Sequence, residues 1–360
     1  MQIEFFCTYA EYPLPGLLSA GINPANRRKN TMFGKAMNRY YYGKSGQGDF
    51  NRDDLPTNRW QLFWEMLRVR FSGLVRLNLM YVVCWLPAIF IIGRFFAMGL
   101  TGLDAVSQLQ VQASTGEIAV EAFNEQFALY AEAIKSLLFQ TLLLLIPAIA
   151  ITGPFTAGIA YVTRNWARDE HAFIWSDFID AVKGNWKQAL LTSVITGVMP
   201  TVVYVCNLYY GGLVASNPLF IIPQVLCWLI GIIWCMMLIY IYPLMVTYEL
   251  SYKGVLRNAA LLAIARLPFS VLVRIGSVVP ALITAAFLYM LTQYSFIILL
   301  VFGAYYVLLG FGLSRFITAS YTNAVFDKYI NPSIEGAVVN RGLYNEEDED
   351  GETDSLSADE

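Results

Sequence analysis

The segment Leu219–Tyr248, LFIIPQVLCWLIGIIWCMMLIYIYPLMVTY, runs for 30 residues without a charged side chain. A helix needs about 20 mostly apolar residues to cross the hydrocarbon of a bilayer, and this segment exceeds that length. Inside hydrocarbon the backbone has no water to pair with, so a spanning segment of this kind must be helical. The segment therefore predicts a transmembrane helix.

Five more apolar stretches accompany this one along the chain. Together they predict six spans, at about residues 74–93, 136–163, 188–210, 219–248, 275–291 and 296–314. We expect an all-α, polytopic membrane domain over residues 58–330. The composition agrees, since 57% of the residues are hydrophobic and 14% are charged, against about 25% charged in soluble domains. This excludes a soluble globular domain, and we expect contact with the lipid bilayer and no nucleic-acid partner.

Basic residues alternate from loop to loop. Residues 27–70, before the first span, contain ten Lys and Arg, whereas residues 103–135 contain one basic residue and five acidic ones. Basic residues return after the second and fourth spans, as Arg164, Arg168, Lys183 and Lys187 and then as Lys253, Arg257, Arg266 and Arg274. Because Lys and Arg accumulate in cytoplasmic loops, we expect both termini in the cytoplasm of a bacterial cell with the spans in its cell membrane.

Both ends of the chain are expected to lie outside the membrane domain. Residues 1–57 are loop-like and predict a mostly irregular cytoplasmic region. Nine acidic residues and no basic one occur in Glu346–Glu360, and setting them aside changes the formal net charge from −3 to +6. A run of like charges repels itself and stays solvated, so we predict a disordered acidic tail over residues 331–360.

Similar stretches precede the first, third and fifth spans. They begin near Trp60, Ser176 and Lys253, and each combines an apolar stripe at helical spacing with basic residues at its edges. This pattern is typical of a helix that lies in the headgroup layer. We therefore expect three helical hairpins, each preceded by an interfacial amphipathic helix.

The loop between the first and second spans is expected to contribute a further helix. Apolar residues recur there at helical spacing and run directly into the second span: Ile118, Phe123, Phe127, Tyr130 and Ile134. We predict that this span continues outward as an amphipathic helix from about Glu117.

Aromatic and basic residues gather on the expected cytoplasmic face. Since aromatic and Arg side chains are favoured in protein interfaces, we take as candidate interface residues Trp60, Trp64, Arg68, Trp166, Trp175 and Trp186. An aromatic belt facing lipid headgroups is the alternative for each tryptophan. Arg94 follows Leu74 by about 30 Å of helix, so we expect it at the outer surface as an anchor or a ligand contact.

Residues for chemistry are sparse. The sole histidine, His171, lies in a loop, and Cys84, Cys206, Cys227 and Cys235 lie in predicted spans. One histidine without nearby cysteines does not make a zinc site. We therefore expect no catalytic residues, no metal and no cofactor, and predict that the protein is not an enzyme.

Several motifs resemble the YesL-like family of bacterial integral membrane proteins, a family of unknown function. The resemblance covers about residues 32–329 and rests on GPFTAG (153–158), Tyr161, RDE (168–170), WSDF (175–178) and GNWKQA (184–189), with YGKSGQGD (42–49) and NRWQLFW (58–64) upstream. Genes of this family often lie beside sugar-import ABC systems and carbohydrate-degrading enzymes. The resemblance thus implies a place in carbohydrate uptake.

Two functions fit these observations. The first is a non-catalytic accessory or regulatory partner of a carbohydrate-import ABC permease. The alternative is a small-solute transporter in its own right, for which Gln140, Asn207 and Gln224 are the polar residues within the spans.

The expected topology can be tested by labelling single cysteines in a variant without the native ones. A cysteine placed in residues 116–126 should react with an impermeant reagent on intact cells. A cysteine in residues 168–177 should not react, because the charge alternation places that loop in the cytoplasm. Labelling of residues 168–177 from outside would contradict the topology.

Overall fold

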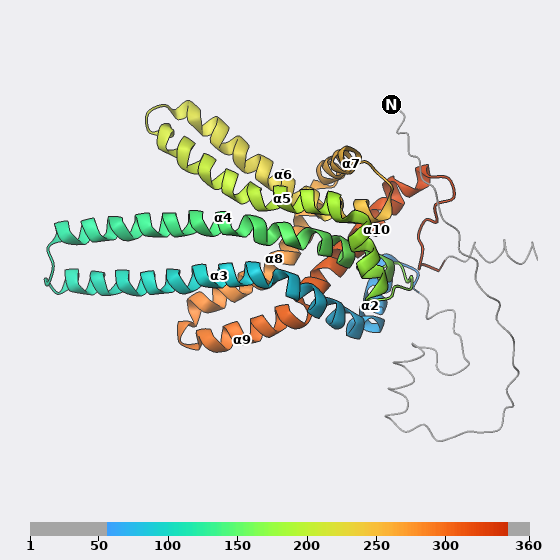
Figure 1. The fold of residues 1–360 in the computed structure, drawn as a ribbon, viewed down its shortest axis with the longest axis horizontal. Helices are drawn as coiled ribbons and strands as arrows, with labels where there is room; N and C mark the ends of the chain where they lie inside the picture. The colour runs from blue at the N-terminus through green and yellow to red at the C-terminus, as the bar shows by residue number, and fades with distance from the viewer. Residues whose placement is uncertain (1–55, 345–360) are drawn as a thin grey trace, which may run out of the picture. The chain divides into compact units, whose positions relative to one another are not determined.

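The structure is a computed structural model that describes residues 56–344, and these form helices and connections without a strand. Short 3-10 turns and a π-helix, η4 (Tyr306–Gly310), join some of the elements. The α-helices are α2 (Arg59–Val69), α3 (Phe71–Ser114), α4 (Val120–Trp166), α5 (Ser176–Val214), α6 (Ile221–Thr247), α7 (Tyr252–Ala265), α8 (Leu267–Met290), α9 (Ser295–Tyr305) and α10 (Phe311–Tyr329) (Figure 1).

The prediction of an all-α protein with six spans is confirmed. In the described part of the chain, six helices are long and apolar enough to cross a membrane, namely α3, α4, α5, α6 with its preceding turn, α8, and the column from Ser295 to Ser333. That column joins α9, η4 and α10 end to end. The predicted irregular region and the motif at 42–49 fall largely in residues 1–55, outside the described residues.

The first two spans extend far past their predicted ends. Residues 103–135 are helical except for a turn between Ser114 and Val120, so α3 and α4 form one long hairpin (Figure 1). The prediction that the second span continues outward as a helix is confirmed, with its start at Val120. At about 1.5 Å per residue, α3 and α4 measure about 65–70 Å, roughly twice the thickness of the hydrocarbon layer. The extension of α3 to Ser114 was not predicted.

Two of the three expected interfacial helices are separate elements. The backbone leaves helical geometry at Arg70 between α2 and α3, and at Arg266 between α7 and α8. The second differs from the expectation, because α5 runs unbroken from Ser176 to Val214. Residues Gly184 and Asn185 stay helical there, and the Asn185 side chain donates to the Ala181 carbonyl.

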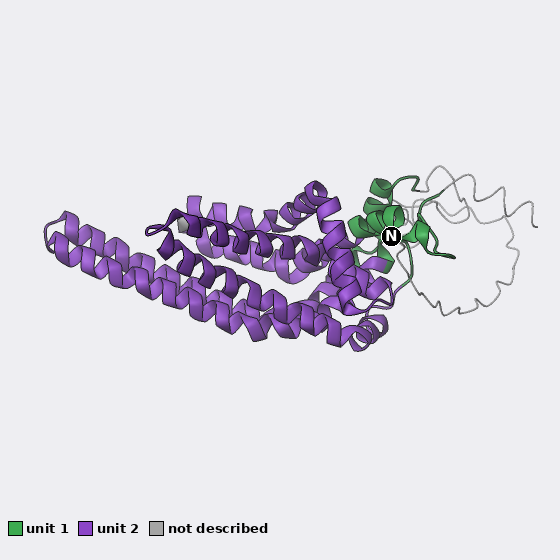
Figure 2. Cartoon of the chain, turned by 90° about the horizontal axis from the view of Figure 1, so that it is seen from above, with its two compact units in different colours: residues 1–72, 165–171, 320–360 green, residues 73–164, 172–319 purple. Residues whose placement is uncertain are grey.

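The chain divides into two compact units (Figure 2). In the described part, unit 1 contains residues 56–72, 165–171 and 320–344. Unit 2 contains residues 73–164 and 172–319 and carries most of the length of the spans.

Within unit 2, α4 and α5 approach each other closely. A Cβ on Gly153 would lie 2.4 Å from the Ala189 carbonyl oxygen and 2.2 Å from Ser193 Oγ. Ser193 Oγ in turn donates to the Ala150 carbonyl at 2.7 Å. Small residues allow this approach in a bilayer, where helices associate by packing and by interhelical hydrogen bonds.

A buried amide on α3 holds the π-helix η4 in place. Asn78 is fully buried and its Nδ2 donates to the carbonyl oxygens of Tyr306 and Val307, at 3.0 and 2.6 Å. Its Oδ1 accepts from the Gly312 N–H at 2.6 Å. Since a π-turn disturbs the regular helical hydrogen bonds, the amide supplies partners where the column is irregular.

The close crossing of α4 and α5 predicts that Gly153→Ala destabilises the protein. The expected cost is about 1–3 kcal/mol, the usual effect of adding atoms to a packed interior. Gly184→Ala is the matched control, because a Cβ there meets nothing within 4 Å and alanine favours a helix by about 1 kcal/mol. Thermal unfolding in detergent measures both. A Gly153→Ala protein as stable as the wild type would contradict the crossing.

Candidate functional site

The amphipathic helix α2 presents exposed indole rings. Asn58 caps its first turn, since its side chain accepts from the backbone N–H groups of Trp60 and Gln61. Leu62 and Met66 point inward and are 2% and 5% exposed, whereas Trp60 and Trp64 are 67% and 52% exposed. The buried residues fix the orientation of the helix, so its tryptophans are held outward by packing on the other side.

The outward rings form a cluster with one another. Trp60 lies 6.0 Å from Phe63 and 5.6 Å from Trp64 between ring centroids, and Phe63 lies 5.3 Å from Trp64. Two of these contacts are edge-to-face, which is a preferred arrangement of aromatic rings. We call Trp60, Phe63 and Trp64 the α2 aromatic surface.

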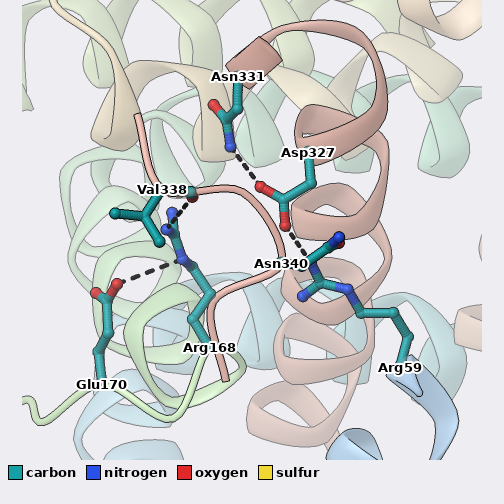
Figure 3. A network of polar contacts seen from close by, with 7 residues as sticks. All are labelled: Arg59, Arg168, Glu170, Asp327, Asn331, Val338 and Asn340. Atoms are coloured by element: carbon teal, nitrogen blue, oxygen red, sulfur yellow. Dashed lines mark hydrogen bonds and ion pairs between the residues drawn. The ribbon is translucent and has the colours of Figure 1, made fainter. Parts of the chain in front are cut away.

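A polar network in unit 1 anchors α2 to the end of α10 (Figure 3). Arg59 forms an ion pair with Asp327, whose side chain is 4% exposed, and also donates to Asn340 Oδ1 at 3.1 Å. Asn331 donates to the other oxygen of Asp327. The buried carboxylate therefore has a charged and an amide partner, as burial of a charge requires.

The loop after α4 joins the same unit. Asp169 adopts a positive φ of 56°, and the backbone N–H groups of Asp169 and Glu170 donate to the carbonyls of Trp166 and Asn165. This is the Schellman arrangement that ends helices. Glu170 then pairs with Arg168 at 3.3 Å and with Arg341 at 3.2 Å. The RDE motif thus has a structural role here.

The segment that follows α10 is folded as far as residue 344. Arg168 donates to the Val338 carbonyl, and the Tyr344 N–H donates to the Pro56 carbonyl at 3.0 Å. Gly342 has a φ of +82°, and a Cβ there would lie 2.8 Å from the Arg168 carbonyl oxygen. Residues 331–344 therefore differ from the predicted disordered tail, because they precede the acidic run and make specific contacts with Arg168, Glu170 and Pro56. The acidic run itself, residues 345–360, lies outside the described residues.

The predicted interface residues fall into three groups. Trp60, Trp64 and the exposed Arg68 share α2. Trp175 and Trp186, in unit 2, are 68% and 48% exposed, and Lys187 Nζ lies 5.6 Å from the Trp186 ring. Trp166 does not fit the expectation, because it is 2% exposed and packs in the interior.

Arg94 lies within α3, twenty residues before the helix ends at Ser114. Its guanidinium approaches Met98 Sδ at 3.5 Å, a contact within the same helix. Because α3 continues to Ser114, Arg94 is followed by twenty more helical residues, where the sequence predicted a loop. Its role as an anchor or a ligand contact stays a prediction.

One exposed aromatic residue escaped the sequence analysis. Phe173 is 64% exposed and lies two residues before Trp175. Its N–H donates to Asp177 Oδ2 at 2.9 Å, which fixes the turn that leads into α5. The usable signal was the apolar run Phe173, Ile174 and Trp175 shortly after the charged residues 168–170.

Among residues 56–344, no three His, Cys, Asp or Glu side chains are grouped so that they could hold a metal ion. His171 is exposed in the loop between α4 and α5. The arrangement with the clearest potential is thus a surface for contact, the α2 aromatic surface.

Comparison with known proteins adds one finding. Residues 133–206 match the family model described as "Protein of unknown function, DUF624". The match covers most of α4, the loop with the RDE motif and the larger part of α5, including the Gly153–Ser193 crossing. No curated protein and no solved structure matches the chain.

The polar network predicts that Arg59→Ala destabilises unit 1. The change leaves Asp327 buried without its cation, which costs about 3–5 kcal/mol in comparable cases. Arg68→Ala, on the same helix, is the control and should stay within about 0.5 kcal/mol, as exposed substitutions do. The double variant Arg59→Ala/Asp327→Asn should recover much of the loss because no buried charge remains. Thermal unfolding measures the stability of the three variants. Equal destabilisation by Arg59→Ala and Arg68→Ala would refute the prediction.

Proposed function

We propose that this protein is a non-catalytic accessory or regulatory partner of a carbohydrate-import ABC transporter in the bacterial cell membrane, with both termini in the cytoplasm. The α2 aromatic surface is the contact site. One observation carries the proposal: two tryptophans are more than half exposed on a helix whose opposite side is buried and tied by an ion pair.

Physical chemistry favours contact at such a surface. Aromatic and Arg residues are enriched in protein interfaces, and Trp is over-represented among the residues that contribute most binding energy. Because α2 is already fixed by Arg59 and its buried residues, little conformational entropy is lost when a partner binds its rings. Arg68 adds a positive charge on the same helix.

The carbohydrate assignment rests on the sequence. The motifs that resemble the YesL-like family include NRWQLFW at residues 58–64, which forms the start of α2 and contains the α2 aromatic surface. The family implies an association with sugar-import systems. The matched family of unknown function, at residues 133–206, adds no activity.

The polar residues that favoured a transporter have partners of their own. Gln224 donates to Asn207 Oδ1 at 2.9 Å, and Trp228 donates to the same oxygen at 3.2 Å. Gln140 donates to Ser136 Oγ within α4. Such hydrogen bonds hold neighbouring helices or turns together in a membrane, which supports the partner proposal over the transporter.

Substitution of the tryptophans tests the proposal. Trp60→Ala and Trp64→Ala should each lower the amount of permease that copurifies from native membranes by at least about tenfold, as expected for central interface residues. Their thermal stability should match the wild type, because both rings are exposed. Glu65→Ala, on the same helix, is the control and should leave copurification unchanged.

Three results would overturn the proposal. Unchanged copurification in both tryptophan variants would remove the α2 aromatic surface as the contact site. A photoreactive amino acid in place of Trp60 that labels lipid alone would show an ordinary headgroup contact. If the purified protein in liposomes moved a sugar or an ion by itself, the transporter function would replace the partner function.

A further inference from the structure

A cavity of about 190 Å³ lies within unit 2, between the inner faces of several spans. This is far more than the roughly 10–15 Å³ that one water molecule needs. Its lining comes from α3, α6, α8, η4 and α10 and includes Trp85, Arg274, Ser277, Tyr306, Ser314 and Arg315. The cavity is separate from the α2 aromatic surface, which belongs to unit 1.

Two arginines line this one cavity. Arg274, on α8, donates to the Cys235 carbonyl of α6, and its Nε is buried without a hydrogen-bond partner. The Arg315 guanidinium, on α10, lies 5.7 Å from the centre of the Tyr242 ring. Among the described residues that line the cavity there is no carboxylate. Two like charges beside one cavity repel each other unless an anion lies between them.

The depth of both residues is set by the short turn between α8 and α9. Counted from residues 291–294 at about 1.5 Å per residue, Arg274 lies about 25 Å along α8 and Arg315 about 30 Å along the α9–α10 column. The hydrocarbon layer is about 30 Å thick. Both guanidinium groups therefore lie near the far edge of that layer, at the level where phosphate groups of lipids begin.

We propose that Arg274 and Arg315 form a binding site for a phosphate group in this cavity. A guanidinium matches the oxygens of a phosphate with paired hydrogen bonds, and a phosphate has enough oxygens to engage two arginines at once. Ser277 and Ser314 bring hydroxyl groups to the same lining. The phosphate belongs to a phospholipid headgroup or to a small soluble phosphate, and both present the same group to the arginines.

The full-length protein in neutral detergent allows both sources to be tested. Native mass spectrometry measures retention of phosphatidylglycerol against diacylglycerol, which has no phosphate. Thermal unfolding measures stabilisation by inorganic phosphate against chloride at equal ionic strength. Arg274→Gln and Arg315→Gln remove one charge each from the cavity. Arg257→Gln is the matched control, because Arg257 is exposed on α7 and outside the cavity lining.

The wild type and Arg257→Gln should bind the phosphate group, and both cavity variants should bind it at least about tenfold more weakly. Retention of phosphatidylglycerol without a response to inorganic phosphate identifies a lipid headgroup. Stabilisation by inorganic phosphate identifies a small soluble ligand. The proposal is overturned if the wild type responds to neither probe, or if the cavity variants bind as well as Arg257→Gln.

A third variant covers the case in which both glutamine variants fail to fold. Ser277→Leu keeps both arginines and places a larger apolar side chain in the cavity, so it should fold and lose binding at least about tenfold. Unchanged binding in Ser277→Leu would overturn the proposal. Phosphate binding in the cavity does not involve the permease. Failure of the phosphate-site proposal therefore leaves the proposed function intact, and failure of the proposed function leaves the phosphate site intact.

Discussion

One amide side chain joins the first span to the last. The three hydrogen bonds of Asn78 tie α3 to the irregular point where η4 meets α10. In hydrocarbon, each backbone group without a partner is costly, so the π-turn depends on this contact. The same point brings Trp85 and Phe311 into a stack at 5.4 Å and starts α10, whose next turn carries Ser314 and Arg315 to the cavity. The geometry of the last span thus follows from one polar residue in an apolar helix.

Hydropathy and charge predicted the number of spans well but not their ends. The apolar core of α3 ends near Gly93, yet the helix continues to Ser114, because helical hydrogen bonding persists where a partner helix runs alongside (Figure 1). The outward helix before the second span was predictable, since its apolar residues repeat at helical spacing. The π-turn was not predictable, because no local sequence pattern between Tyr306 and Gly310 indicates it. Asn78 was the available signal: a lone amide in an apolar span needs a partner.

The candidate sites were likewise predictable from the sequence only in part. Trp60 and Trp64 were chosen as interface residues by residue type and expected face, and both side chains are exposed, while their role stays a prediction. Trp166 was misplaced because its position after a span suggested a surface, whereas it is buried. The sequence placed Arg274 only among the basic residues that follow the fourth span. Only the packing of α6, α8 and α10 shows that Arg274 and Arg315 line one cavity. The two residues are far apart in the sequence, so local spacing does not predict that they lie close together.

Unit 1 draws its residues from three distant parts of the chain, 56–72, 165–171 and 320–344 (Figure 2). The chain is made from its N-terminus onward, so five complete span helices, α3 to α6 and α8, are synthesised between Arg59 and Asp327. Contacts of such long sequence separation form late. Unit 1 can therefore be completed only after residues 320–344 have been synthesised, and a chain that stops before residue 320 lacks Asp327, the ion-pair partner of Arg59 on α2.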